Sequence, residues 1–176
     1  NKKKNIALMG HMGSGKSVLG KLISKQLNFN HVDSDKLIEK KSNKTINEIF
    51  QTKGESYFRL IEENVILETI YQKKLVLSLG GGSILSPKIR KALKGNFLTV
   101  FLDVDFAILS KRLIKSKRRP LINDTNIEEK IKELDAIRRK FYLLADITLK
   151  NHLTITDALA EFRKKYIEFY EKYNSN

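Results

Sequence analysis

Short apolar runs alternate along the chain with longer stretches in which apolar residues recur every three or four positions. A run of about four to eight apolar residues between turn signals is typical of a buried strand, and helical spacing predicts an amphipathic helix. We expect strands at residues 5–9, 31–33, 75–79, 97–102 and 147–149. Strands that alternate with helices predict an α/β fold in which a parallel sheet is covered by helices on both faces.

Capping signals and glycines mark the ends of several expected helices. Thr45 and Glu48 have the spacing of a capping box, and Gly54 is placed to end the short helix that they open. The next helix is expected to turn one face inward, which carries Phe58, Ile61, Val65, Ile66 and Thr69. A later helix is expected to do the same with Ile127, Ile131, Leu134, Ile137, Phe141 and Leu144.

The segment from Gly10 to Ser17 reads Gly-His-Met-Gly-Ser-Gly-Lys-Ser and fits the pattern G-x-x-x-x-G-K-[ST]. It lies between an expected strand and an expected helix, which is the context of a phosphate-binding loop, or P-loop. Glycines let backbone N–H groups point at an anion, and the helix N-terminus adds positive charge. Lys16 can then reach the terminal phosphates of a nucleotide, and Ser17 can ligate Mg²⁺. The alternative is a chance glycine-rich turn, against which the flanking strand and helix argue.

Two further motifs follow expected strands. Asp33 and Asp35 come after the second strand, and Gly80, Gly81 and Gly82 come after the third. Because ligands bind at the carboxyl ends of parallel strands, we expect both motifs to meet the P-loop in one crevice. Three glycines after a buried strand indicate that the backbone approaches a ligand closely. A tight turn is the alternative, although such a turn usually needs fewer glycines.

The two aspartates suggest two different tasks. If strand geometry persists as far as Asp35, the side chains of Asp33 and Asp35 point to opposite sides. One could then face a metal beside Ser17 and the other a substrate hydroxyl, as phosphoryl transfer requires. A solvated turn at the end of a strand is the alternative. The P-loop favours the functional interpretation.

Arg59 and Glu62 lie three residues apart on an expected helix and therefore share a face. As an exposed ion pair they would contribute little to stability. Alternatively, Glu62 could hold Arg59 so that its planar guanidinium binds a substrate carboxylate. This signal is weak by itself.

Residues 115–126 break the helical pattern, since they are basic, polar and interrupted by Pro120. The segment could be a solvated run of charge. In phosphoryl transfer, a closing loop can also bring an arginine onto the transferring phosphate and exclude water, and Arg118 and Arg119 are the candidates. No partner cluster is visible for the three histidines, His11, His31 and His152, and we assign them no role.

Composition narrows the classes of function. The net charge is +14, from 34 Lys and Arg against 20 Asp and Glu. This charge permits nucleic-acid binding, but lysine is spread through nearly every segment, which favours a basic surface with a pocket for anionic substrates. Cysteine is absent, which excludes disulfides and thiolate metal sites. No apolar run approaches the roughly 18 residues of a membrane span and no signal peptide is apparent, so we expect one cytoplasmic domain.

Taken together, the motifs resemble those of shikimate kinases from one end of the chain to the other. They are G-H-M-G-S-G-K-S at 10–17, D-S-D at 33–35, G-E-x-x-F-R-x-x-E at 54–62, G-G-G at 80–82, R-R-P-L at 118–121 and R-x-x-x-Y-x-x-x-A-D at 138–146. Many ATPases share the P-loop, but the ordered combination is highly specific. The resemblance implies a three-layer P-loop NTPase fold similar to nucleoside monophosphate kinases, with a five-stranded parallel sheet in the order 2-3-1-4-5. It also implies a single domain over 1–176, with a substrate-binding subdomain at about 34–62 and a lid loop at about 115–126.

The resemblance further implies transfer of the γ-phosphate of ATP to the 3-hydroxyl of shikimate, in the synthesis of aromatic amino acids. Asp35 would hold the reacting hydroxyl and could act as its base, while Arg59 and Arg138 would grip the shikimate carboxylate. The backbone of Gly80, Gly81 and Gly82 would line the ring.

By the same resemblance, Asp33 and Ser17 would support Mg²⁺, with Asp33 acting through water. The nucleotide would be bound by Gly13, Ser14, Gly15, Lys16, Ser17, Val18, Arg112 and Arg119. Of these, Lys16 and Arg119 would also be catalytic. Arg112 would pack on adenine.

Two rival functions come from different classes. One is another carbohydrate kinase of similar fold, such as gluconate kinase, because a pair of arginines fits either acid. The other is a basic nucleic-acid-binding NTPase, against which the absence of a Walker-B acid after residues 75–79 argues. We therefore expect ATP and shikimate as partners, a monomer, and no nucleic acid or membrane partner.

Overall fold

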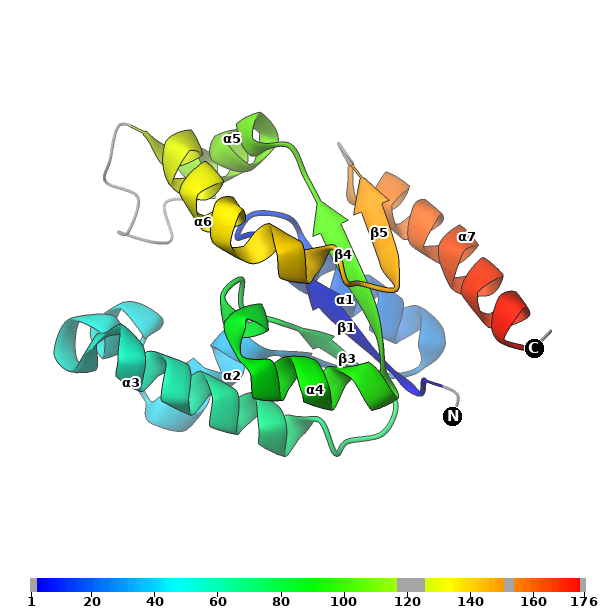
Figure 1. Cartoon of the computed structure of the whole chain (residues 1–176), viewed down its shortest axis with the longest axis horizontal. Helices are drawn as coiled ribbons and strands as arrows, with labels where there is room; N and C mark the ends of the chain where they lie inside the picture. Colours follow the sequence, from blue (N-terminus) through cyan, green and yellow to red (C-terminus); the bar gives the residue numbers. More distant parts are fainter. Residues whose placement is uncertain (1–2, 117–125, 151–153, 175–176) are drawn as a thin grey trace.

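The structure is a computed structural model that describes residues 3–116, 126–150 and 154–174. Its strands are β1 (Asn5–Met9), β2 (Asn30–Asp33), β3 (Leu75–Ser78), β4 (Phe97–Asp103) and β5 (Ile147–Lys150). They form one sheet in the order β2-β3-β1-β4-β5 (Figure 1), and every neighbouring pair is parallel. The predicted fold class and strand order are therefore confirmed.

Helices cover both faces of this sheet. They are α1 (Lys16–Leu27), α2 (Ser34–Ser42), α3 (Ile46–Thr69), the 3₁₀ helix η1 (Ser83–Leu85), α4 (Pro87–Asn96), α5 (Phe106–Ser116), α6 (Ile127–Tyr142) and α7 (Ile155–Asn174). Helices α1 and α7 pack on one face, and α3, α4 and α6 pack on the other. Within the described ranges, none of these helices has the length and apolar character needed to cross a membrane.

The central strand shows why the chain forms this layered core. Ile6 and Leu8 of β1 pack with residues of α1 and α7, whereas Ala7 and Met9 pack with residues of α3, α4 and α6. Successive side chains of a strand point to opposite faces. A strand covered on both faces is therefore apolar along nearly its whole length, as the run from Ile6 to Met9 in the predicted strand shows.

Helix α3 begins as predicted and bends at Gly54. Thr45 and Glu48 form a complete capping box, in which each side chain bonds the other residue's backbone N–H. Gly54 has φ 79° and ψ 173°, a conformation that interrupts the helix and that residues with a Cβ rarely adopt. Helices α2 and α3 share a separate small apolar cluster beside the sheet, while the subdomain boundary at residue 62 stays a prediction.

The predicted inner face of α6 is wrong at two positions. Ile137 and Leu144 are 57 % and 73 % exposed, whereas Asp135 and Tyr142 are buried. Positions four or seven residues apart share a helix face, so the face that starts at Ile131 continues through Asp135 and Tyr142. Counting apolar residues alone missed this face because one of its members is an aspartate.

Candidate active site

The P-loop, the end of β2 and the three glycines after β3 lie at the same edge of the sheet, because β2, β3 and β1 are parallel neighbours. Gly13 and Gly15 have positive φ angles of 81° and 98°, which bend the loop before α1. Lys16 Nζ donates to the carbonyl oxygens of Gly10 and His11, both at 2.8 Å. One wall of the predicted crevice is therefore a curled loop, and the Lys16 side chain folds back over that loop.

Ser17 and Asp33 meet at this edge. The Ser17 hydroxyl donates a hydrogen bond to Asp33 Oδ2, and Asp33 Oδ1 accepts the backbone N–H of Lys36 at 3.2 Å. A hydroxyl and a carboxylate are the hard oxygen ligands that Mg²⁺ prefers. The described residues contain no group of three His, Cys, Asp or Glu side chains able to enclose a metal. A metal between Ser17 and Asp33 would therefore need phosphate oxygens and water as its other ligands.

Strand geometry does not persist to Asp35, contrary to the expectation. β2 ends at Asp33, which caps α2, and Asp35 lies in the first turn of that helix. The carboxylate of Asp33 points to Ser17, whereas Asp35 Oδ1 lies only 2.5 Å from where a Cβ on Gly80 would be. The buried hydroxyl of Ser34 accepts the Gly80 N–H at 2.8 Å and joins the start of α2 to the end of β3. The two carboxylates thus diverge because a helix starts between them.

Each of the three consecutive glycines leaves room for a different side chain. A Cβ on Gly80 would lie 2.5 Å from Asp35 Oδ1, and one on Gly81 would lie 3.2 Å from Arg138 Nη1. A Cβ on Gly82 would lie 2.5 Å from both terminal nitrogens of Arg59. Any larger residue would displace one of these groups. The glycines therefore let these three side chains approach the loop closely, and the predicted close approach of a ligand to the same backbone stays a prediction.

Arg59 and Glu62 are not an exposed surface pair. Glu62 is 2 % exposed, and its Oε2 accepts Arg59 Nη1 at 2.7 Å while its Oε1 accepts the Ser83 hydroxyl at 2.6 Å. Burial would lower the pKa of Arg59, but the charges and hydrogen bonds of Glu62 and Glu55 raise it above its usual value. The guanidinium is consequently held in one orientation and stays charged.

Arg59 and Arg138 line the same cavity, which has a volume of about 140 Å³. Gly81, Gly82 and His11 also contribute to its wall, and the remaining lining is largely apolar. Buried Arg138 Nε has no hydrogen-bond partner among the described residues. Two guanidinium groups on one small cavity form a site for an anion, since a planar fork binds a carboxylate through two parallel bonds.

A second hollow, of about 180 Å³, lies beside the P-loop. It is lined by Gly13, Ser14, Gly15, Val18, Arg112, Thr154, Ile155 and Ala158. Arg112 Nη1 donates to the Gly13 carbonyl at 3.1 Å, so five of the predicted nucleotide residues line this hollow, whereas Lys16 and Ser17 do not. Larger hollows of about 610 and 530 Å³ contain none of the predicted site residues. We place the site at the carboxyl edge, where parallel sheets bind ligands.

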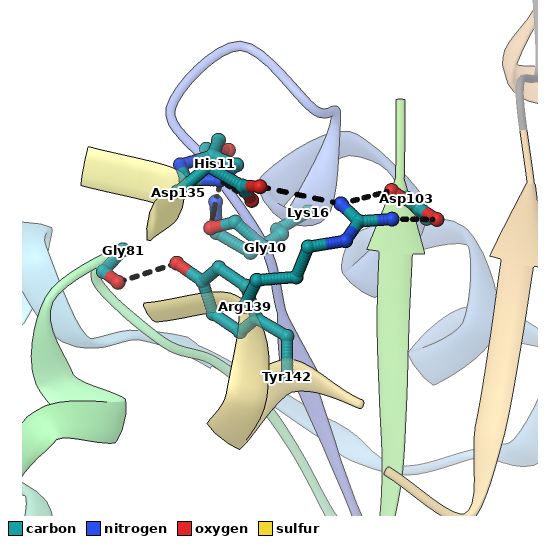
Figure 2. A network of polar contacts seen from close by, with 8 residues as sticks. All are labelled: Gly10, His11, Lys16, Gly81, Asp103, Asp135, Arg139 and Tyr142. Carbon is teal, nitrogen blue, oxygen red and sulfur yellow. Dashed lines mark hydrogen bonds and ion pairs between the residues drawn. The ribbon is translucent and has the colours of Figure 1, made fainter. Parts of the chain in front are cut away.

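One network at this edge was missed by the sequence analysis (Figure 2). His11 of the P-loop, 5 % exposed, bonds through Nε2 to Asp135 Oδ1 of α6 at 2.7 Å. Arg139 bridges Asp135 at 3.5 Å and both carboxylate oxygens of Asp103, at 3.3 and 3.1 Å. The missed signal was the spacing of Asp135, four residues after Ile131 on the buried face.

Tyr142 ties the same helix to the glycine loop. Its hydroxyl donates to the Gly81 carbonyl at 2.6 Å, and its ring stacks on Phe101 of β4. Burial raises the pKa of Tyr142 to about 12, so the hydroxyl keeps its proton and remains a donor. The edge of its ring also meets His11.

Several predicted residues lie outside the described residues. These are Arg118, Arg119 and most of the expected lid, together with His152. His31 bonds to the Ser78 hydroxyl at 3.0 Å.

Acidification is expected to lower the stability of the protein through His11. Burial lowers the pKa of His11 below 6.5, and the charges of Arg138 and Lys16 act in the same direction, against the opposing bond to Asp135. Below about pH 6.5 the unfolded chain therefore binds the proton more readily than the folded chain, so stability falls with pH until the folded histidine also protonates. Urea unfolding at pH 7.5 and 5.5 measures the free energy of unfolding. Between these two pH values, His11→Gln should lose less of it than the wild type, because its amide replaces the ring donor without titrating. Equal losses in the two proteins would contradict this account.

Comparison with known proteins agrees with these observations. The sequence model of the family described as shikimate kinase matches residues 12–170. A shikimate kinase of Thermoanaerobacter pseudethanolicus is 36 % identical over 165 residues, which cover 93 % of this chain and 96 % of the relative. The solved shikimate kinase of Acinetobacter baumannii in complex with shikimate is 34 % identical, with a TM-score of 0.86 over 93 % of this chain and 92 % of that chain. A gluconokinase of Sinorhizobium meliloti, 19 % identical with a TM-score of 0.66 over 97 % of both chains, shares the fold alone. The chain belongs to the shikimate kinase family.

Proposed function

We propose that this protein transfers the γ-phosphoryl group of ATP to the 3-hydroxyl of shikimate, giving shikimate 3-phosphate and ADP. The observation that carries the proposal is the cavity shared by Arg59 and Arg138, which also includes His11 of the P-loop. An acid held by its carboxylate in this cavity would lie beside the loop that binds phosphates. Family membership supports shikimate as that acid.

In this proposal each polar group has one task. Arg59 and Arg138 bind the carboxylate and orient the ring against the glycine loop. Asp35, packed against Gly80, orients the 3-hydroxyl and accepts its proton as the hydroxyl oxygen bonds to the γ-phosphorus. The bond from that phosphorus to the β,γ-bridging oxygen breaks, and ADP leaves. Lys16 stabilises the negative charge on the β- and γ-phosphates.

We further propose that the nucleotide binds with Mg²⁺ held by Ser17 and, through water, by Asp33. The ion would neutralise phosphate charge, which is the chemistry that it supplies in phosphoryl transfer. The hydroxyl–carboxylate contact between Ser17 and Asp33 supports this assignment. Gly13, Ser14, Gly15, Val18 and Arg112 would bind the rest of the nucleotide, because they line one hollow.

We also propose that the protein acts as a monomer on two small substrates in the cytoplasm, as the sequence predicts. A coupled ADP-release assay with shikimate, gluconate and nucleoside monophosphates in parallel tests the substrate. We expect ADP release with shikimate as the acceptor, and none with gluconate or the nucleoside monophosphates. Turnover with gluconate instead would move the chain to the rival function.

Replacing either clamp arginine by lysine is expected to raise KM for shikimate about 10–100-fold. Each charge-assisted bond to a carboxylate contributes about 1.5–3 kcal/mol, and a lysine cannot reproduce the two-pronged geometry. Steady-state kinetics of Arg59→Lys and Arg138→Lys should show this change, while KM for ATP barely moves.

Arg163→Lys is the matched control, because Arg163 is exposed on α7. Its shikimate kinetics should equal those of the wild type. A shikimate amide, which lacks the charge, should be a poor substrate for the wild type and should lose little more with Arg138→Lys. Unchanged shikimate KM in both clamp variants would overturn the substrate assignment and leave the kinase assignment standing.

A further inference from the structure

Helix α6 is joined to three strand ends by buried or half-buried polar contacts (Figure 2). His11 joins it to the P-loop through Asp135 at 2.7 Å, and Tyr142 joins it to the glycine loop through the Gly81 carbonyl at 2.6 Å. Arg139 joins it to Asp103 at the end of β4. The contacts come from one side of the helix, at positions separated by four, three and seven residues.

Arg138 lies on α6 between Asp135 and Tyr142, two of the residues that make these contacts. Its Nε is buried without a hydrogen-bond partner among the described residues, and its Nη1 lies 3.2 Å from where a Cβ on Gly81 would be. Arg59, in contrast, donates hydrogen bonds to the carboxylates of Glu62 and Glu55 on its own helix. The Arg138 side chain interacts with the Tyr142 hydroxyl of the same helix, so its position in the cavity follows the position of α6.

His11 contacts both the P-loop, through its backbone, and helix α6, through its ring. Its backbone carbonyl accepts Lys16 Nζ at 2.8 Å and the Ser14 N–H at 3.2 Å. Its ring bonds Asp135 and meets the edge of the Tyr142 ring. A shift of the loop at His11 would consequently move the contact that holds α6.

We propose that His11 and Asp135 are positioning residues that couple the nucleotide site to the site for the acid substrate. The buried pair fixes the position of α6, and with it Arg138, relative to the P-loop. When nucleotide orders the loop, Arg138 is therefore placed to bind the carboxylate of the acid substrate. This inference rests on the proposed function of the site. Neither residue contacts the reacting atoms in the proposal, and both act through Arg138 and Lys16.

A purely structural role would lower stability without changing the coupling between the two ligands. Coupling is the ratio of the shikimate dissociation constants measured without and with a nonhydrolysable ATP analogue. Isothermal titration with the full chain gives both constants. His11→Phe keeps an aromatic ring against Tyr142 but removes the donor, and Asp135→Ala removes the acceptor.

We expect Asp135→Ala to bind shikimate about 5–50-fold more weakly in the presence of the analogue, within the usual range of coupling between sites, and almost normally in its absence. His11→Phe, which also changes the wall of the cavity, should lose the same coupling between the two ligands. KM for shikimate should rise at saturating ATP, with a smaller change in kcat. The double variant should be no worse than the more affected single one, because both remove one interaction. His11→Gln, which keeps a donor for Asp135, should restore most of the coupling.

Glu133→Ala is the matched control, since it breaks an exposed ion pair with Lys130 on the same helix; its coupling should be that of the wild type. Thermal unfolding by circular dichroism identifies any variant that fails to fold, and Asp135→Ala and His11→Phe serve as independent tests. Absence of shikimate turnover by the wild type would contradict both the proposed function and this inference. Normal wild-type turnover with unchanged coupling in folded variants would overturn this inference alone.

Discussion

Asp35→Asn is expected to lower kcat for shikimate phosphorylation about 10²–10⁴-fold, the usual contribution of a general base. The amide keeps the size of the side chain but cannot take the proton of the 3-hydroxyl. Asp35 packs against Gly80, whereas Asp33 is the carboxylate bonded to Ser17. Nucleotide affinity should therefore change little, and a coupled assay together with titration of an ATP analogue measures the two effects separately.

Asp105→Asn is the matched control for this substitution. Asp105 is exposed and, like Asp35, lies at the start of a helix that follows a strand, but it follows β4 and lines a different hollow from that of Arg59 and Arg138. Its kinetics should be those of the wild type. An Asp35→Asn protein with normal kcat would show that the carboxylate neither orients nor deprotonates the hydroxyl.

Lys16→Ala is expected to reduce kcat by at least about 10²–10³-fold, the effect of removing one preorganised group that stabilises transition-state charge. Lys16 Nζ lies over the P-loop, at 2.8 Å from the Gly10 and His11 carbonyls, where a bound phosphate chain would meet its charge. Turnover is measured by ADP release and folding by thermal denaturation, which should shift little because the side chain is half-buried at the edge of the sheet.

Lys25→Ala removes the same charge from the opposite end of α1, where Lys25 is exposed, and should leave turnover unchanged. This control separates loss of a phosphate contact from a general change of net charge. Near-normal turnover in a folded Lys16→Ala protein would mean that the P-loop does not bind the transferred phosphate as proposed.

Local signals were sufficient to predict the elements of this fold. The apolar runs predicted β1, β3 and β4 to within a residue or two, because both faces of a parallel sheet are buried at its centre. The edge strands β2 and β5, which are more polar and less buried, were also predicted to within a residue or two. The capping box at Thr45 predicted where α3 starts, whereas Gly54, expected to end that helix, lies at a kink within it. The strand order came from the resemblance to a known family, since short apolar runs carry no record of which strand pairs with which.

Helix starts were less predictable where two structures compete. Asp33 and Asp35 alternate as they would in a strand, yet α2 begins between them at Ser34. An aspartate at a strand end is equally suited to cap a helix, and sequence spacing does not distinguish the two. The divergence of the two carboxylates was anticipated, but for the wrong geometric reason.

The sequence by itself determined the layered α/β core, the curled phosphate-binding loop and the kinds of side chain at the carboxyl edge of the sheet. These features depend on neighbours along the chain: the pleat of a strand, the period of a helix and the conformational range of glycine. Only the tertiary structure decided which distant groups meet. It placed Asp35, Arg138 and Arg59 against three consecutive glycines, and it turned Asp135 inward onto His11. A buried charge is compensated by partners from other elements, so a polar residue on a core face cannot be told from a surface one until the chain is folded.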